Sequence, residues 1–397
     1  MKGLPLAAST LTNACGVGIG EVRAALRADR SGLRQNNFEP ALGLDTWIGR
    51  VDGLESVVLP SKFAAYDCRN NRLAQLCLEQ DGFIAAVASA RERYGKDRIA
   101  VFLGTSTSGI LSTELALRAR TPASAEPPSP LSPEFYRCQH NMYATTDFVR
   151  AYLGLSGHAM TISTACSSSA KVFAAAARAI DARLCDAAVV GGVDSLALST
   201  LFGFHSLELL SRQPCRPFAA ERDGISIGEG AGFALLDPFD EGPVRLVGFG
   251  ESADAFHMSS PHPEGAGAAS AMRSALTSAH LTADAIDYIN LHGTASRAND
   301  AAEDRAVMTV FGADTAASST KGWTGHLLGA AGITEALISA LALADQWLPR
   351  TLNCVRVDTA LQSNIQLESR AMPLRRVMSN SFGFGGSTCS LVLGLDR

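Results

Sequence analysis

The chain has 397 residues, of which 47% are hydrophobic and only 18% are charged. This composition supports a large buried core and argues against a disordered chain. The net charge of −5 argues against nucleic-acid binding as the main function.

The length suits two domains, or two halves that share one core. The nine cysteines contain no C-x-x-C pair, so neither a disulfide framework nor a structural zinc site is expected. The first residues lack the apolar core of a signal peptide. No run of about 18 apolar residues stands out, so no membrane span is expected. We therefore predict a protein of the reducing cytoplasm.

Short apolar runs without strict alternation are typical of strands that are covered on both faces. In chain order they are residues 99–103, 187–190, 232–236, 286–290 and 389–393. Two Ala-rich stretches, residues 168–183 and 327–344, predict helices that pack closely inside the protein. The alternation of strands and helices favours an α/β layered fold.

Residues 118–135 contain five prolines. Proline at this density excludes a regular helix or a central strand. We predict an exposed surface loop, with part of a lid or a dimer-side insertion as the alternative.

Cys166 stands in the segment TISTACSSSA, where a β-prone stretch leads into small residues that open a helix. A thiol at a helix N-terminus is favoured as the thiolate, the reactive form of cysteine. A buried, inert cysteine fits the same segment.

His292 follows an apolar run directly, in INLHGTASRAND, and Lys321 and His326 flank a turn in SSTKGWTGHLLGAAG. A side chain at the carboxyl end of a strand projects to the sheet edge where ligands bind. Each of these residues alone is compatible with a structural role. A zinc site formed with Cys166 lacks the i, i+3 or i, i+4 ligand pair, so we expect no metal.

Five segments resemble one known family in their order and spacing. They are TACSSSA, RPFAAERDGISIGEGAGFALL, NLHGTASRAND, STKGWTGHLLGAAG and NSFGFGGSTCSLVLG. Together they resemble the β-ketoacyl-acyl-carrier-protein synthases, the elongating condensing enzymes of the thiolase superfamily. The resemblance implies a thiolase-like α/β fold of two similar halves in five α-β-α-β-α layers. Residues 1–240 would carry the nucleophile, and residues 241–397 would carry both histidines, the lysine and a Gly-rich gating loop.

By this resemblance, Cys166 accepts an acyl chain from a carrier protein. His292 and His326 then hold the malonyl thioester of a second carrier and stabilise the enolate as carbon dioxide leaves. The resulting carbanion attacks the acyl group on Cys166. Covalent catalysis splits one difficult transfer into two easier steps, and imidazole N–H groups suit a developing oxyanion. The backbone amides of Cys166 and Phe384 would form a second oxyanion hole.

The resemblance assigns supporting roles to further residues. Lys321 would add positive charge, and Glu335 would pair with it, as a buried lysine requires. Asp300 and Glu303 match acidic positions with a structural or water-organising role. The predicted gating loops comprise Gly383, Phe384, Gly385 and Gly386 in one, and Asp254 and His257 in the other.

Three positions depart from the family pattern. Ser387 and Thr388 stand where Thr and Asn are common, which affects the expected hydrogen bonds of the gating loop. Ser296 replaces a usual Thr and keeps the hydroxyl. The small residues after Cys166 and the segment CRNNRLAQL resemble synthases of specialised polyene or polyketide pathways, so fatty acid synthesis and a specialised pathway both remain open.

The expected partner is an acyl carrier protein, which supplies its own phosphopantetheine, so no bound cofactor is expected. Lys62, Arg69 and Arg72 lie close together in the sequence and are a candidate docking patch for this acidic partner. The family resemblance implies a homodimer, or a heterodimer with a related subunit. Neither the acyl-chain length nor the starter group follows from these motifs.

Several other activities fit the sequence less well. A thiolase would carry a second cysteine in the Gly-rich loop, where Phe384 stands, and Cys389 falls in the next strand. An initiating or plant-type synthase would have asparagine in place of His326. A cysteine hydrolase would need one histidine, and a chain-length-factor-like partner typically lacks the nucleophile that this chain keeps.

Overall fold

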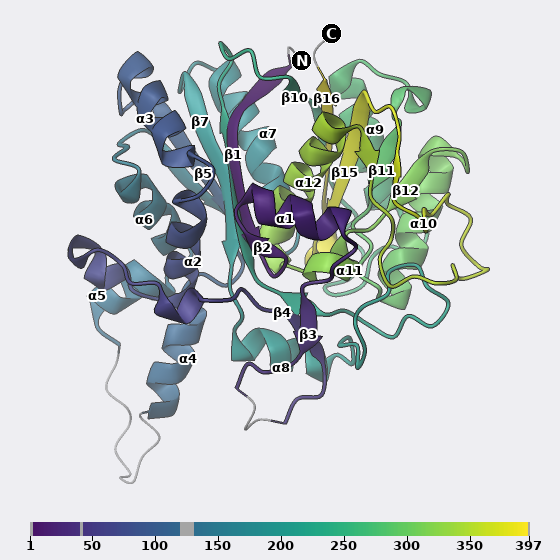
Figure 1. Ribbon diagram of the computed structural model, residues 1–397, viewed down its shortest axis with the longest axis horizontal. Coiled ribbons are helices and arrows are strands. Elements are labelled where there is room, and N and C mark those ends of the chain that lie inside the picture. Colours follow the sequence, from purple (N-terminus) through teal and green to yellow (C-terminus); the bar gives the residue numbers. More distant parts are fainter. Residues whose placement is uncertain (1–2, 40–42, 120–130, 396–397) are drawn as a thin grey trace.

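The computed structural model describes residues 3–39, 43–119 and 131–395. Two sets of five strands form its framework, with helices between them and on both outer sides (Figure 1). From left to right in Figure 1 the layers alternate helix, sheet, helix, sheet, helix. The predicted five-layered α/β arrangement is thus present.

The first set of strands has the order β6-β5-β7-β9-β1. Its members are β1 (Leu4–Asn13), β5 (Ile99–Gly104), β6 (Ala159–Ile162), β7 (Ala187–Asp194) and β9 (Gly230–Leu236). Strand β5 runs parallel to β6 and β7, whereas β9 is antiparallel to both β7 and β1.

The second set repeats this pattern in the order β12-β11-β15-β16-β10. Its members are β10 (Val244–Ala253), β11 (Tyr288–Asn290), β12 (Ala316–Ser318), β15 (Arg376–Phe382) and β16 (Ser387–Leu395). Strand β11 is parallel to β12 and β15, and β16 is antiparallel to β15 and β10. Among the described strands, the two sets join only where β1 pairs briefly with β10. Each predicted strand falls within one of these elements, except that β11 starts two residues later than expected.

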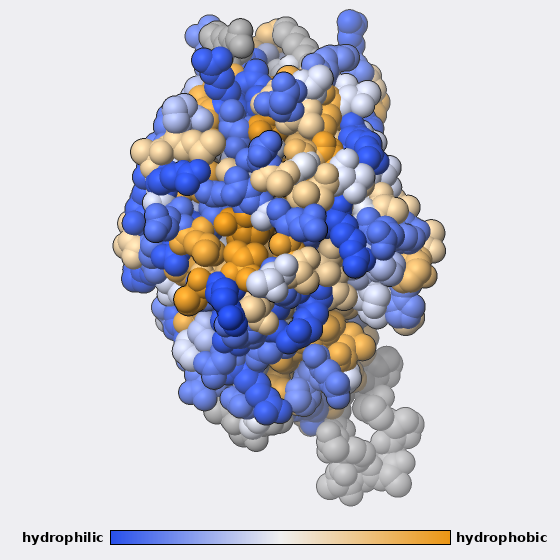
Figure 2. Space-filling view, turned by 90° about the vertical axis from the view of Figure 1, so that its right-hand side faces the viewer, coloured by the Kyte–Doolittle hydropathy of each residue, from blue (hydrophilic) through white to orange (hydrophobic). Residues whose placement is uncertain are grey.

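Two Ala-rich helices, α7 (Ser168–Asp181) and α12 (Ala331–Asp345), lie between the two sets of strands. Both were predicted from the sequence. Helices α2 (Arg69–Leu78), α3 (Phe83–Tyr94) and α6 (Ala144–Tyr152) cover the outer side of the first set. Helices α9 (Ala266–Ala279) and α10 (Arg297–Phe311) cover the other side, where polar side chains spread over most of the surface and apolar ones gather near its middle (Figure 2).

Shorter elements complete the chain. They are α1 (Ile19–Arg27), α4 (Ile110–Ala119), α5 (Pro133–Phe135), α8 (Leu198–Ser206), α11 (Lys321–Thr324), β2 (Gly16–Val17), β3 (Leu33–Gln35), β4 (Trp47–Gly49), β8 (Ile227–Gly228), β13 (Trp347–Leu348) and β14 (Arg370–Ala371). Most of the predicted proline-rich loop, residues 120–130, lies outside the described residues. Its two flanks are helical, in α4 and α5.

One stretch, Leu328–Asp345, is long and apolar enough to cross a membrane by composition alone, contrary to the expectation that no such run exists. However, 83% of it is buried inside the protein. This stretch contains α12, which packs against α7 and both sets of strands. Its apolar composition therefore reflects its place in the protein core.

The contact between α7 and α12 requires very small side chains. A Cβ atom added to Gly332 would lie 2.4 Å from the backbone nitrogen of Ala170. Just beside this contact, the backbone N–H of Ile333 donates to Ser169 Oγ at 2.9 Å. The two central helices therefore pack almost backbone to backbone at their N-terminal ends.

We predict that Gly332→Ala lowers the free energy of unfolding by about 1–3 kcal/mol, because the added methyl group overpacks this contact. Gly203→Ala is the matched control, since its Cβ meets nothing within 4 Å in α8. It should be neutral or stabilising by up to about 1 kcal/mol. Urea unfolding of both variants measures the difference, and equal stabilities would contradict the close packing of α7 and α12.

Candidate active site

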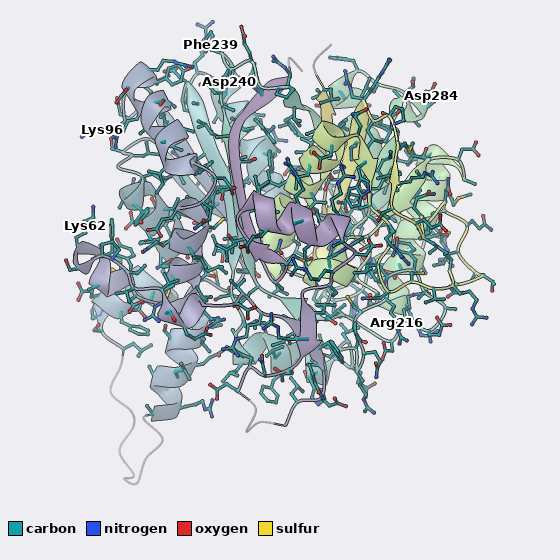
Figure 3. The ribbon with its side chains drawn as sticks, in the orientation of Figure 1. Lys62, Lys96, Arg216, Phe239, Asp240 and Asp284 are labelled. Atoms are coloured by element: carbon teal, nitrogen blue, oxygen red, sulfur yellow. The ribbon has the colours of Figure 1, made fainter. Side chains whose placement is uncertain are left out.

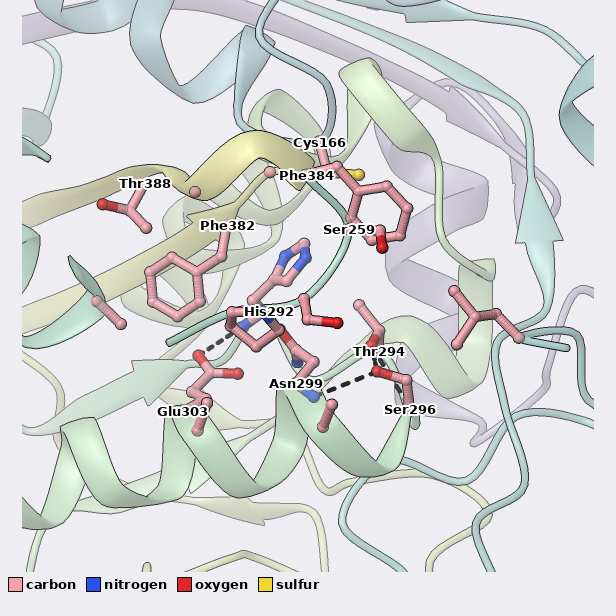
Figure 4. A pocket seen from close by; sticks show the side chains of 18 of the residues that line it. Cys166, Ser259, His292, Thr294, Ser296, Asn299, Glu303, Phe382, Phe384 and Thr388 are labelled. Atoms are coloured by element: carbon pink, nitrogen blue, oxygen red, sulfur yellow. Dashed lines mark hydrogen bonds between the residues drawn. The ribbon is translucent and has the colours of Figure 1, made fainter. Parts of the chain in front are cut away.

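The reactive side chains predicted from the sequence lie on loops that follow parallel strands. Cys166 follows β6, His292 follows β11, and Lys321 and His326 follow β12. Cys166, His292 and His326 line one pocket together with Phe384, which lies on the turn between β15 and β16 (Figure 4). Lys321 lies behind His292 rather than on the pocket wall. Thus four loops, distant in sequence, meet at the carboxyl ends of the two sets of strands.

Cys166 precedes the N-terminus of α7, on a tight turn in which Ala165 adopts a φ of 51°. Its Sγ lies 2.9 Å from Nε2 of His326. Burial raises the pKa of the Cys166 thiol to about 12, while the Lys321 charge and the backbone N–H of Phe384 oppose the rise. The thiol is therefore protonated in the resting site, and its nearest base is His326.

The two histidine rings stand 5.3 Å apart, centroid to centroid, and nearly perpendicular. Burial lowers the pKa of both rings well below the usual value, and the nearby Lys321 charge lowers it further. Both imidazoles are therefore neutral at neutral pH. Each can donate a hydrogen bond from one nitrogen and accept one at the other.

Lys321 is buried and fixes the state of His292. Its Nζ donates to Glu335 Oε1 and to the backbone carbonyl of His292, and it lies 3.4 Å from His292 Nδ1. Because an ammonium group can only donate, Nδ1 is the acceptor and the proton of the ring sits on Nε2. His326 differs, since its Nδ1 is buried without a hydrogen-bond partner among the described residues.

The backbone of His326 is held by the segment that precedes β9. Its N–H donates to the carbonyl of Ser226 at 2.7 Å, and its carbonyl accepts from Gly228 N at 2.9 Å. This short ladder explains why the motif at residues 216–236 accompanies the histidine motif: it forms the surface on which the His326 loop rests.

Glu303 and Asp300 hold the turn that carries His292. Glu303 accepts hydrogen bonds from the backbone N–H groups of His292 and Gly293 at 2.8 and 2.7 Å. Asp300 accepts from Ala295 N at 3.2 Å and from Phe218 N at 2.8 Å. Burial raises the pKa of Glu303 to about 7, and these backbone donors oppose the rise. The sequence left a structural and a water-organising role open for Asp300 and Glu303, and these hydrogen bonds fit the structural role.

The two predicted gating loops contact each other. A Cβ on Gly386 would lie 1.9 Å from Asp254 Oδ1, so only glycine fits there. The backbone N–H of Asp254 donates to the carbonyl of Gly386 at 3.1 Å. Thr388, one of the departures from the family pattern, joins the same contact by donating to the carbonyls of Ser252 and Gly267. His257 lies apart: it is exposed, and its Nδ1 accepts from Ser259 N at 3.2 Å.

Sequence reasoning missed two aromatic residues of the pocket. Phe204 of α8 packs its ring 5.5 Å from the ring of Phe384, and Phe382 lies 5.7 Å from His292. Phe382 immediately precedes the Gly-rich loop, so its position was the only available signal. Nothing in the sequence of α8 pointed to Phe204.

The candidate docking patch is not formed as predicted. Arg69 points inward and pairs with Glu229, whose side chain is 0% exposed, and with Glu55. Arg72 is held by Asp67 in a bidentate pair. Lys62 is exposed at the outer edge of the molecule and lies over the ring of Phe63 (Figure 3). The Arg69 part of the prediction is wrong, because the buried acid Glu229, between β8 and β9, competes for that side chain.

The Lys321–Glu335 pair leads to a prediction about stability. Lys321→Met should lower the free energy of unfolding by about 3–5 kcal/mol, because it leaves a buried carboxyl group unpaired. The double variant Lys321→Met/Glu335→Gln should recover most of this loss while remaining inactive.

The decrease in the free energy of unfolding caused by Lys321→Met should grow as the pH rises. Burial raises the pKa of Glu335 to about 7 even with Lys321 present to oppose it. The unfolded chain releases this proton near pH 4.5, so a rising pH favours the unfolded state until the folded group also ionises. Urea unfolding at acidic and alkaline pH tests the sign, and a loss that is constant with pH would contradict it.

Comparisons with known proteins agree with this geometry. The sequence matches the beta-ketoacyl synthase N-terminal domain over residues 72–241 and the beta-ketoacyl synthase C-terminal domain over residues 244–355. It is 32% identical to a 3-oxoacyl-[acyl-carrier-protein] synthase 2 of Vibrio cholerae, with 90% of this chain and 94% of that protein aligned.

Solved structures show the same relationship. One similar structure is the ketosynthase ApeO in complex with its chain length factor ApeC from Xenorhabdus doucetiae. The chain superimposes on a chain of this complex with a TM-score of 0.90 and 37% sequence identity, and 99% of this chain and 98% of that one are covered. A beta-ketoacyl synthase from Burkholderia phymatum superimposes with a TM-score of 0.88 and 28% sequence identity, and all of both chains is covered. The fold is thiolase-like, and the chain belongs to the β-ketoacyl-acyl-carrier-protein synthase family of acyltransferases.

Proposed function

We propose that Cys166, His292 and His326 condense a malonyl group on an acyl carrier protein with an acyl group held on Cys166. The observation that carries this assignment is the contact of Cys166 Sγ with His326 Nε2 at 2.9 Å, beside a second neutral imidazole. A hydrolase would use the first contact but has no need of the second. The carrier supplies phosphopantetheine, and the proposed chemistry requires no other cofactor.

In the acyl-transfer step, His326 Nε2 accepts the thiol proton as Sγ attacks the thioester carbonyl of the acyl carrier. The backbone N–H groups of Cys166 and Phe384 receive the oxyanion of the tetrahedral intermediate. This intermediate collapses to the Cys166 thioester, and His326 returns the proton to the departing phosphopantetheine thiolate. The neutral state of His326 supports its role as the base.

In the condensation step, His292 and His326 each donate from Nε2 to the thioester carbonyl of the malonyl group. The bond between the carboxylate and the α-carbon breaks, carbon dioxide leaves, and the electron pair forms an enolate whose oxygen the two N–H groups stabilise. The α-carbon then attacks the Cys166 thioester and expels the thiolate, which takes up one proton from solvent, so that the step consumes one proton overall.

The two histidines support this division of labour in different ways. Lys321 holds His292 with its proton on Nε2, which suits a permanent donor. His326 must accept a proton in the first step and donate in the second. Its unpartnered Nδ1 lets the ring take either tautomer, as this double role requires.

The subunit partner binds along strand β6 in this proposal. Among the described strands β6 pairs with β5 alone, so its other edge is available for strand addition. The side chain of Met160 on β6 is 40% exposed. The neighbouring Thr161 donates from Oγ1 to the carbonyl of Met142, and the side chains of Met142 and Tyr143 are also exposed. An apolar patch beside a free strand edge fits a second copy of the chain or a related subunit. The ketosynthase complexes with chain length factors among the similar structures support the second possibility.

We further propose that the chain consists of two halves, residues 1–240 and 241–397, and acts in the cytoplasm. The repeated strand order supports this division, since each half contributes five strands with the same neighbours and directions. The boundary falls in the loop between β9 and β10.

Intact-mass measurement with a panel of acyl-carrier thioesters tests the catalytic assignment. We expect the wild-type protein to gain one acyl group and Cys166→Ala to gain none. His292→Ala should still be acylated but should release carbon dioxide from malonyl-carrier at least about 100-fold more slowly, because it lacks one enolate donor. Acylation of Cys166→Ala, or undiminished decarboxylation by His292→Ala, would refute these roles.

The subunit interface leads to a second test. Met160→Asp should convert the wild-type dimer to monomer, because it places a charge in the apolar contact. Leu184→Asp is the matched control, since Leu184 is 63% exposed and lies on the loop between α7 and β7. Light scattering after size exclusion measures the mass of each. A dimeric Met160→Asp variant would rule out this interface, and a monomeric wild-type protein would rule out its use between two copies of the chain.

A further inference from the structure

A further buried carboxylate, which the sequence did not single out, lies beside the candidate active site. Asp194 ends strand β7, is 0% exposed, and accepts hydrogen bonds from the loop that follows β5. Its Oδ1 accepts from Thr105 Oγ1 at 2.7 Å and from the N–H of Thr107 at 2.9 Å. The N–H and hydroxyl of Ser106 donate to the same carboxylate. Burial raises the pKa of Asp194, and this set of donors opposes the rise by stabilising the ionised carboxylate.

Asp194 also reaches the loop that carries His326. The backbone N–H of Gly329 donates to Asp194 Oδ2 at 2.6 Å. A Cβ on Gly329 would lie 2.7 Å from the same oxygen, so the close approach requires glycine. Leu328, between this glycine and the histidine loop, adopts a left-handed φ of 53°. The turn after His326 is therefore held in an unfavourable conformation, and its Gly329 N–H donates to Asp194 and, at 3.3 Å, to Ser106 Oγ.

We propose that Asp194 is the positioning residue that fixes His326 against Cys166. His326 is held on one side by its ladder with Ser226 and Gly228, and Asp194 holds the other side through Gly329. Without this second attachment the turn relaxes, and Nε2 moves away from Sγ. The proposal rests on the proposed catalytic roles of Cys166 and His326, and Asp194 itself does not line the pocket wall.

Asp194 has a second effect through its charge. It opposes ionisation of the Cys166 thiol and thereby adds to the effect of burial, as does Glu335, while Lys321 acts in the opposite direction. The neutral rings of His292 and His326 complete the groups that face Sγ. Asp194 thus reinforces the effect of burial on the thiol, while it holds in place the base that removes the proton.

The test combines two variants that separate position from charge. Asp194→Asn removes the charge and leaves backbone N–H donors facing an amide. We expect kcat for condensation to fall by about 10- to 100-fold with KM for the carrier unchanged. Alkylation of Cys166 by iodoacetamide, followed by peptide mass analysis, should show its pH midpoint about one pH unit lower. Gly329→Ala keeps the charge but displaces the turn, so kcat should fall without a lower midpoint.

Asp237→Asn is the control, because Asp237 is another buried aspartate at a strand end but binds Tyr94 and Arg93 far from the pocket. It should leave kcat and the alkylation midpoint unchanged. The proposal is overturned if Gly329→Ala keeps kcat within about twofold of wild type. It is also overturned if a folded Asp194→Asn variant keeps kcat within about twofold of wild type. If Asp194→Asn does not fold, the kcat of Gly329→Ala alone tests the proposal. Failure of the proposed function would show separately, as a wild-type protein that takes up no acyl group on Cys166.

Discussion

The close contact between α7 and α12 is the constraint on which the site depends. Cys166 lies just before α7 and His326 just before the turn that leads into α12, so the distance between the helices sets the distance between Sγ and Nε2. Glycine and alanine at the contact let the two backbones approach almost to touching. A larger side chain there would separate the two reactive atoms before it disturbed either sheet, because interiors packed at this density transmit displacement.

A single buried cation organises the electrostatics of the site. Lys321 carries the positive charge that helps to keep both histidines neutral, fixes the tautomer of His292 and partly offsets the effect of burial on Cys166. A buried ammonium group is costly unless it is paired, and Glu335 supplies the pairing from the first turns of α12. The same helix that brings the two halves together therefore also carries the counter-ion that makes the site possible.

The sequence predicted the fold and the reactive residues to different extents. Strands with both faces covered and the two Ala-rich helices were recognisable because their composition follows directly from double burial. Cys166, His292 and His326 were found because short motifs carry them, and the site geometry brings all three together. Arg69 was misjudged because its partner, Glu229, lies 160 residues away, between β8 and β9, and only the fold brings the two together. Asp194 and Phe204 were missed for the same reason, since neither stands in a motif that suggests chemistry.

The repeated strand order places the proposed nucleophile beside one set of strands and the proposed acid–base groups beside the other. Strands β6 and β12 occupy equivalent places at the ends of their sets, and each leads through a loop into a central helix. The first loop carries Cys166 and the second carries Lys321 and His326, so equivalent positions hold the two partners of the proposed proton transfer. Strands β5 and β11 are also equivalent, and a buried carboxylate holds the loop after each: Asp194 in the first half and Glu303 in the second. The loop after β11, which Glu303 holds, places His292 at the pocket. The loop after β5, which Asp194 holds, binds the carboxylate through hydroxyl and backbone N–H groups. A carboxylate that bound the loop after β5 alone would stabilise only that loop. Asp194 also accepts a hydrogen bond from Gly329, and this bond links it to the loop that carries His326.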